Sequence, residues 1–367
     1  MKILIDIGHP AHVHYFRNFI KIMQSKNHNI LVIARDKEVS QDLLKRYDIE
    51  YVTRGKGGDG FTGKMLYLIK TNFILFFKAL SFKPDIFLSF SSPYAAQVSW
   101  VLRKPHIGFT DTEHAKLGNY AFMPFTSNII TPKAFLTDLG EKHIRFNGFM
   151  EQCYLSPKYF TPAEDVSELL NIKKDEEYIL LRFVSWGAVH DAGHSGLSDT
   201  TKQEIIDTLS KKYKIFISAE GSLPEKFMKY KLNIPSDKMH DILTHATLFI
   251  GEGATMASEC AILGTPAIYV NSLNAGTLIA QEKSGSIFGF RDSKGVLEKA
   301  LEILETPNLK EKFQENRALL LKESIDITAF TVWLVESYPD SVVLLKKDIE
   351  YQNKFRNKEL SDDKVNL

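Results

Sequence analysis

Cysteine is scarce in this sequence, which limits the kinds of protein that it can encode. The 367 residues contain two cysteines, Cys153 and Cys260, which lie far apart and lack the spacing of metal ligands. Such usage argues against a disulfide framework and a zinc site, and it is typical of a reducing compartment. We therefore expect a cytoplasmic protein.

An excess of either charge is also absent. Lys and Arg number 46 against 45 Asp and Glu, which gives a net charge of +1 and no basic field for nucleic acid. The N-terminal stretch MKILIDIGHP is too short and too interrupted for a signal peptide. No apolar run approaches the roughly 18 residues of a membrane span. We expect no nucleic-acid partner, and any membrane contact to be peripheral.

Short β-rich runs alternate with helical patterns in two successive sets. The first set begins at "KILIDIG" and the second at "EYILLRFVSW". This alternation predicts an α/β fold of parallel βαβ units, with two Rossmann-like domains facing across a cleft. The predicted parts are an N-terminal domain (1–160), a second domain (161–325), C-terminal helices that pack back on the first domain (326–350) and a polar tail (351–367).

The stretch "TLFIGEGATMASECAIL" predicts a strand, a tight loop and a helix. Gly251 and Gly253 let backbone N–H groups approach a ligand, and a helix start suits a phosphate. Glu259 lies about 7–9 Å further along the axis, at roughly 1.5 Å per residue, where its carboxylate can accept hydrogen bonds from ribose hydroxyls. Arg182 is a candidate partner for phosphate. The alternative is an ordinary βα turn with a surface Glu.

The segment "GEGATMASECAILGTPAIYV" resembles the donor-binding segment of GT-B glycosyltransferases, and "GHPAHVHYFRNFIKIMQSKNHNILVIARD" resembles the N-terminal loop, helix and strand of the GlcNAc transferase of peptidoglycan lipid-intermediate synthesis. The motifs "DIGHPAHVHYFRN", "RFVSWGAVHD", "FTDTEHA" and "FTVWLVESYPDSV" are more similar to a bacterial and archaeal family catalogued as a domain of unknown function. The resemblance covers the chain to about residue 355.

This resemblance implies a GT-B fold with an N-terminal acceptor domain, a nucleotide-sugar domain and a C-terminal helix that crosses back. It implies a metal-independent enzyme that uses a nucleotide-diphosphate sugar as substrate and needs no resident cofactor. By the same resemblance, Glu259 binds ribose. The diphosphate contacts Gly253, Ala254 and Thr255, and the base lies against Met239 and His240.

Acid–base candidates follow three predicted strands. "GHPAHVH" holds His9, His12 and His14, which could bind a metal, although no thiol or carboxylate lies beside them. The alternative is a general base or an oxyanion partner, and His12 matches the functional loop histidine of the resembled transferase. His9 or His14 could hold this role instead, and two of the three can be satisfied histidines at a helix start.

Two further loops carry candidates. In "FTDTEHAKLGN", Asp111, Glu113 and His114 lie where a carboxylate could deprotonate an acceptor hydroxyl. The alternative is that Asp111 or Thr112 caps a helix, which is compatible with a functional Glu113. In "SWGAVHDAGHSGLSD", His190 and Asp191 can form an acid–base pair, and the alternative is a plain polar loop.

The stretch "MLYLIKTNFILFFKALSFK" predicts a helix that is either a core helix or one lying at a lipid interface through residues 64–83. The hypothesis that unites these features is a glycosyltransferase of cell-envelope or exopolysaccharide synthesis, with a lipid-linked or saccharide acceptor. It would work in the cytoplasm, at the inner membrane face if the acceptor is a lipid. The alternatives are a non-hydrolysing UDP-N-acetylhexosamine 2-epimerase, with Asp111, Glu113 and His190 near the sugar, or a non-catalytic nucleotide-sugar binding protein.

Overall fold

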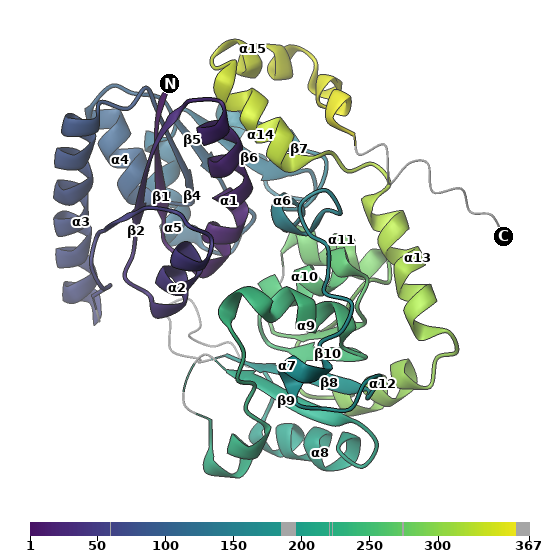
Figure 1. Ribbon diagram of the computed structural model, residues 1–367. Coiled ribbons are helices and arrows are strands. Elements are labelled where there is room, and N and C mark those ends of the chain that lie inside the picture. Colours follow the sequence, from purple (N-terminus) through teal and green to yellow (C-terminus); the bar gives the residue numbers. More distant parts are fainter. Residues whose placement is uncertain (59, 185–195, 220, 222, 274, 357–367) are drawn as a thin grey trace. The chain divides into compact units, whose positions relative to one another are not determined.

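The computed structural model describes residues 1–58, 60–184, 196–219, 221, 223–273 and 275–356 (Figure 1). It divides into two compact units. Unit 1 comprises Met1–Tyr159 and the segment that begins at Glu323, and unit 2 comprises Phe160–Lys322. The chain therefore leaves unit 1 after Tyr159 and returns to it at Glu323.

Unit 1 contains a parallel sheet of seven strands within the described residues, in the order β3-β2-β1-β4-β5-β6-β7. Its central strands are buried and mostly apolar, as expected for strands covered on both faces, with Asp6, Ser89 and His106 as buried polar exceptions. The strands are β1 (Lys2–Ile7), β2 (Asn29–Ala34), β3 (Val52–Thr53), β4 (Ile86–Phe90), β5 (His106–Phe109), β6 (Asn128–Pro132) and β7 (His143–Phe146).

The helices of unit 1 cover both faces of this sheet. From the centre of the sheet, β1 to β3 follow one another toward one edge, and β4 to β7 follow one another toward the other edge. Right-handed crossovers therefore place α1 and α2 on one face, and α3, α4 and α5 on the other face. The helices are α1 (Pro10–Ser25), α2 (Glu38–Arg46), α3 (Gly60–Phe82), α4 (Pro93–Val101), α5 (Lys116–Phe122) and α6 (Gln152–Leu155).

The C-terminal helices belong to unit 1, where α14 (Ile327–Glu336) packs against α1, and α15 (Asp340–Lys347) follows it. Asp326 begins α14 by accepting from the backbone N–H of Ala329. A 3-10 helix, Ile349–Phe355, occupies the first residues of the predicted polar tail.

Unit 2 contains a second parallel sheet, of five strands in the part of the chain that is described, in the order β12-β11-β10-β8-β9. The strands are β8 (Tyr178–Phe183), β9 (Lys214–Ala219), β10 (Leu248–Gly251), β11 (Ala267–Val270) and β12 (Phe288–Phe290). The helices are α7 (Ser167–Leu170), α8 (Asp199–Leu209), α9 (Met239–His245), α10 (Ala254–Leu263), α11 (Gly276–Lys283), α12 (Val296–Leu304) and α13 (Leu309–Leu321). The predicted α/β class with two Rossmann-like units is confirmed.

Helix α3 corrects one expectation. The sequence predicts no apolar run of membrane length, yet Thr62–Phe82 is long and apolar enough to cross a membrane by length and composition. Only 22% of its most apolar window is buried in the protein. The buried side chains include Tyr67, Leu75 and Ala79, and the last two join the core cluster with Leu4 and Phe87.

Candidate nucleotide site

The topology of unit 2 creates a switch point between β8 and β10. The chain passes from β8 outward to β9 and then returns to the other side of β8 as β10. Arg182 and Gly251 are paired in register at the carboxyl ends of these two strands. Open α/β sheets bind ligands at such a switch point, beyond the carboxyl ends of the strands.

Helix α10 begins at this switch point. Its N-cap is Gly253, which has no side chain to accept a hydrogen bond from the first turn. Ala254 is exposed and Thr255 is partly exposed, so the helix start is reachable from solvent. Unpaired N–H groups and the positive end of the helix dipole favour an anion at such a position.

The two glycines of this turn have different structural roles. A Cβ on Gly251 would lie 2.5 Å from Cζ of Phe249 and 2.8 Å from Cβ of Arg182, so packing requires the glycine. A Cβ on Gly253 would meet Val184 and Arg182 only at 3.7 and 3.8 Å, which is ordinary contact. The protein's own packing is enough to explain Gly251, and the role of both glycines toward a ligand stays a prediction.

Glu259 lies one turn inside α10 and is buried. Its Oε1 is 3.0 Å from Nε2 of His240, and the side chains of both are at most 5% exposed. His240 belongs to α9, whose first residue, Met239, is half-buried. The structure thus brings together two predicted site residues from separate segments and excludes the alternative of an ordinary surface Glu. Buried carboxylates are retained only with partners, and His240 supplies one.

Arg182 and Glu252 border the same turn. Nη1 of Arg182 donates to Oγ of Ser218 at 2.7 Å, which fixes the guanidinium at the carboxyl edge of the sheet. The buried Glu252 accepts from the backbone N–H groups of Val184 at 3.0 Å and Leu197 at 2.8 Å. Glu252 is not among the residues predicted from the sequence. The signal was a carboxylate between two glycines directly after a buried strand.

Unit 1 has its own switch point, between β1 and β4, where a buried ion pair lies. Nε of Arg54 is 2.9 Å from Oδ1 of Asp6, and Oγ of Ser92 donates to the other carboxylate oxygen at 2.5 Å. The Arg54 guanidinium also lies 4.5 Å from the centre of the Tyr94 ring. This cluster was not predicted from the sequence, although the Asp inside the apolar run "ILIDIG" is a signal for it.

The three histidines after β1 have separate environments. Nδ1 of His9 accepts from the N–H of Ala11 and so caps α1. His14 is buried with its ring 5.0 Å from that of Tyr154. His12 is half-buried, and its Nδ1 accepts from the N–H of Gly8 at 3.3 Å. Within the described residues, no group of three metal-ligating side chains is arranged around an ion site.

Burial lowers the pKa of His12 well below 6.5, and the charges of His9, Arg54 and Lys37 lower it further. A neutral ring whose Nδ1 accepts a hydrogen bond carries its proton on Nε2. His12 is therefore suited to donate a hydrogen bond, as an oxyanion partner does, rather than to act as a base.

The loop after β5 contains two carboxylates with different surroundings. Oε1 of Glu113 accepts from the backbone N–H of Leu136 at 3.0 Å, an anchoring contact. Burial raises the pKa of Asp111 to about 6. A hydrogen bond from Thr112 lowers this pKa, and the charge of Glu113 raises it further. Asp111 is thus the group here that is best suited to exchange a proton near neutral pH. His190 and Asp191 lie outside the described residues.

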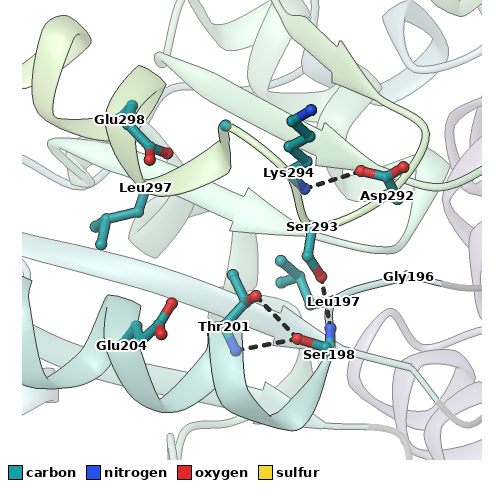
Figure 2. Close-up of a pocket in the computed structure, with 11 residues that line it drawn as sticks. Gly196, Leu197, Ser198, Thr201, Glu204, Asp292, Ser293, Lys294, Leu297 and Glu298 are labelled. Carbon is teal, nitrogen blue, oxygen red and sulfur yellow. Dashed lines mark hydrogen bonds between the residues drawn. The ribbon is translucent and has the colours of Figure 1, made fainter.

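A hollow of about 800 Å³ lies between the N-terminal ends of α8 and α12 and contains none of the predicted site residues (Figure 2). Its polar groups bond one another, since Ser293 accepts from the N–H of Ser198 and Asp292 from that of Lys294. Asp292, Glu204 and Glu298 place three carboxylates on its walls. These carboxylates outnumber Lys294, the lysine among the lining residues, and the net negative charge disfavours a diphosphate here.

Two Rossmann-like units with parallel sheets, the second with an open helix start at its switch point, define the GT-B class of fold. The chain belongs to the DUF354 family, described as a protein family of unknown function, whose model matches residues 1–326. It is 24% identical to the uncharacterized protein MJ0665 of Methanocaldococcus jannaschii over 281 residues, which is 73% of this chain and 81% of that protein.

Solved structures share the fold at low sequence identity. The UDP-GlcNAc 2-epimerase of Neisseria meningitidis bound to UDP-GlcNAc has a TM-score of 0.64 at 11% identity, covering 85% of this chain and 94% of that one. The Streptomyces sp. SF2575 glycosyltransferase SsfS6, complexed with thymidine diphosphate, has a TM-score of 0.60 at 13% identity, covering 92% and 99%. The neighbours are thus epimerases and glycosyltransferases that bind nucleotides or nucleotide sugars.

Proposed function

We propose that this chain is a GT-B enzyme that binds a nucleotide-diphosphate sugar in unit 2 and transfers the sugar to an acceptor. The observation that carries the proposal is the buried His240–Glu259 pair one turn inside the open start of α10. The diphosphate would receive hydrogen bonds from the N–H groups of residues 253–255, and Arg182 would add positive charge. Glu259 would accept from ribose hydroxyls, with Met239 and His240 next to the base.

The transfer step needs a proton acceptor and a stabilised leaving group. As the acceptor oxygen bonds to the anomeric carbon, the bond from that carbon to the diphosphate breaks, and its electron pair leaves with the nucleotide. The start of α10 would stabilise this developing charge. The acceptor's proton would pass to a carboxylate with a raised pKa, the role that we assign to Asp111 in unit 1 in preference to Glu113. His12 would donate a hydrogen bond through Nε2.

The nucleotide sugar is a substrate in this proposal, and no resident cofactor is invoked. We place the enzyme in the cytoplasm and in cell-envelope or exopolysaccharide synthesis, where acceptors are saccharides or lipid-linked sugars. His190 and Asp191 remain predicted acid–base residues.

A 2-epimerase is the second candidate function. It is favoured by the raised pKa of Asp111, because epimerisation at C2 needs a group that takes and returns a proton near neutral pH. The similarity in fold to the epimerase from Neisseria meningitidis is consistent with it.

Binding and turnover separate these functions. Titration calorimetry with UDP, TDP, GDP and ADP identifies the base, and NMR then follows the matching sugar nucleotides. Release of nucleoside diphosphate only in the presence of an acceptor supports the transferase, whereas an isomerised free sugar nucleotide supports the epimerase. Binding without turnover over a panel of acceptors indicates a binding protein. Failure of the intact chain to bind any of the four nucleotides would overturn the site itself.

A further inference from the structure

Helix α3 exposes an apolar stripe along the side that faces away from the sheet. The residues of this stripe recur at intervals of three and four, as they must to share one face of a helix. Phe73 and Phe77 are 59% and 62% exposed, and Leu66 is 68% exposed. We call this the α3 stripe, and its members are Leu66, Ile69, Phe73, Phe77 and Leu80.

The opposite side of α3 is fixed in the protein. Tyr67, Thr71, Leu75 and Ala79 follow one another at intervals of four and are buried. Asn72 also donates to Gln97 of α4 at 2.7 Å. Figure 1 shows α3 along the outer edge of unit 1, beside α4. To span a bilayer, α3 would have to leave the core and expose its buried side. We therefore expect α3 to stay packed on the protein, with the α3 stripe exposed at the protein surface.

The charged residues of α3 itself, and Lys83 directly after it, have one sign. Residues 60–83 contain no Asp or Glu, and all four lysines of this range are exposed, namely Lys64, Lys70, Lys78 and Lys83. Helix α4 ends with the exposed Trp100 and Val101, followed by the exposed Arg103 and Lys104. Helices α3 and α4 precede the parallel strands β4 and β5 of one sheet, so the carboxyl ends of both helices lie at the same edge of that sheet. Arg103 and Lys104 after α4 therefore lie at the same edge as Lys83 after α3.

We infer that the α3 stripe is a docking surface for an anionic lipid bilayer. Such a surface supplies apolar chains for the stripe and phosphate groups for the surrounding lysines, and a tryptophan is favoured at its interface. A second copy of the chain is a poorer occupant, because symmetric pairing would bring lysines from both copies together without a compensating carboxylate in residues 60–83. The inference does not depend on the proposed function.

Vesicle sedimentation with the full-length protein tests the inference. We expect binding to vesicles of phosphatidylcholine and phosphatidylglycerol, and weaker binding to phosphatidylcholine alone. The triple variant Leu66→Gln, Phe73→Gln, Phe77→Gln should lower the partition coefficient by about tenfold or more, because it removes most of the inserted surface. Thermal unfolding should be little changed, since these side chains are already exposed.

Matched variants give the controls. Met228→Gln, Leu319→Gln, Val343→Gln removes three exposed apolar side chains outside α3 and should bind vesicles as the unmodified protein does. Lys64→Gln, Lys70→Gln, Lys78→Gln should reduce binding to anionic vesicles only. The inference is overturned if the unmodified protein does not sediment with anionic vesicles, or if the control triple loses as much binding. It is also overturned if the stripe variant merely converts a dimer to a monomer in ultracentrifugation without a change in vesicle binding.

Discussion

His240 and Glu259 form a buried pair, with Nε2 of the histidine 3.0 Å from Oε1 of the carboxylate. One residue comes from the start of α9 and the other from the second turn of α10. A single contact therefore links the segment predicted to hold a base with the helix predicted to hold a diphosphate.

Replacing Glu259 should separate its role in the fold from its role toward a ligand. Glu259→Ala leaves His240 buried without this acceptor and should cost about 1–3 kcal/mol of unfolding free energy. Glu259→Gln keeps an oxygen for His240 and should fold nearly normally. Both should weaken nucleotide binding by about tenfold or more, measured by calorimetry, because a charged acceptor for ribose hydroxyls is lost.

Glu315→Ala, at an exposed position on α13, is the control. Full nucleotide affinity in both Glu259 variants would remove this residue from the site.

Alanine at the two glycines before α10 should affect different properties, namely folding stability at Gly251 and nucleotide affinity at Gly253. Gly251→Ala forces a methyl group against Phe249 and Arg182 and should destabilise the protein by about 1–3 kcal/mol. Gly253→Ala has room and should cost less than about 1 kcal/mol. If the diphosphate binds at this turn as proposed, the added methyl group should hinder its approach to the backbone N–H groups and weaken nucleotide binding. Urea denaturation and nucleotide titration of both variants check this. A Gly253→Ala protein with unchanged nucleotide affinity contradicts diphosphate binding at this turn.

Asp111 should make the protein less stable as the pH rises. Burial raises its pKa from 3.8 to about 6, so the folded chain holds a proton that the unfolded chain releases. The stability from this group is fully present below about pH 4 and is lost as the pH passes through 6. Asp111→Asn should therefore be more stable than the unmodified protein at pH 7.5, by on the order of 2 kcal/mol, and equal to it at pH 4. Melting temperatures across this range measure the difference.

The same variant tests catalysis. If Asp111 takes the acceptor's proton, Asp111→Asn should lower turnover by about 100-fold, the usual contribution of a general base. Glu113→Gln keeps an oxygen to accept from Leu136 and should lower it far less. An Asp111→Asn enzyme with unimpaired turnover would exclude this residue as the base.

His12 should stay neutral at pH values where an ordinary histidine is charged. Its pKa lies well below 6.5 through burial and nearby positive charges, so NMR of the ring nitrogens should still show the Nε2–H form at pH values below 6.5, where an ordinary histidine is charged. His12→Gln, with an amide N–H to donate, should retain more turnover than His12→Ala. Titration of the His12 ring near pH 6.5 would contradict the assigned state, and the spectrum of His12→Gln identifies its signals.

The fold was predictable because its signals are local. The apolar runs of β1, β4, β8 and β10 and the helical patterns between them dictate parallel βαβ units through burial on both faces of a sheet. The turn at Gly251–Gly253 and the helix after it were readable in the same way, since a glycine N-cap and apolar periodicity act within a few residues.

The state of each site residue was decided by contacts between distant segments. Asp6 and Ser92 are 86 residues apart in sequence, and His240 and Glu259 are 19 apart. The sequence could name three histidines after β1, but only packing made His9 a helix cap, His14 a buried aromatic neighbour and His12 a neutral donor. The local sequence pattern determines secondary structure. Burial and hydrogen-bond partners determine the protonation state and the accessibility of a side chain, and both exist only once the chain has folded.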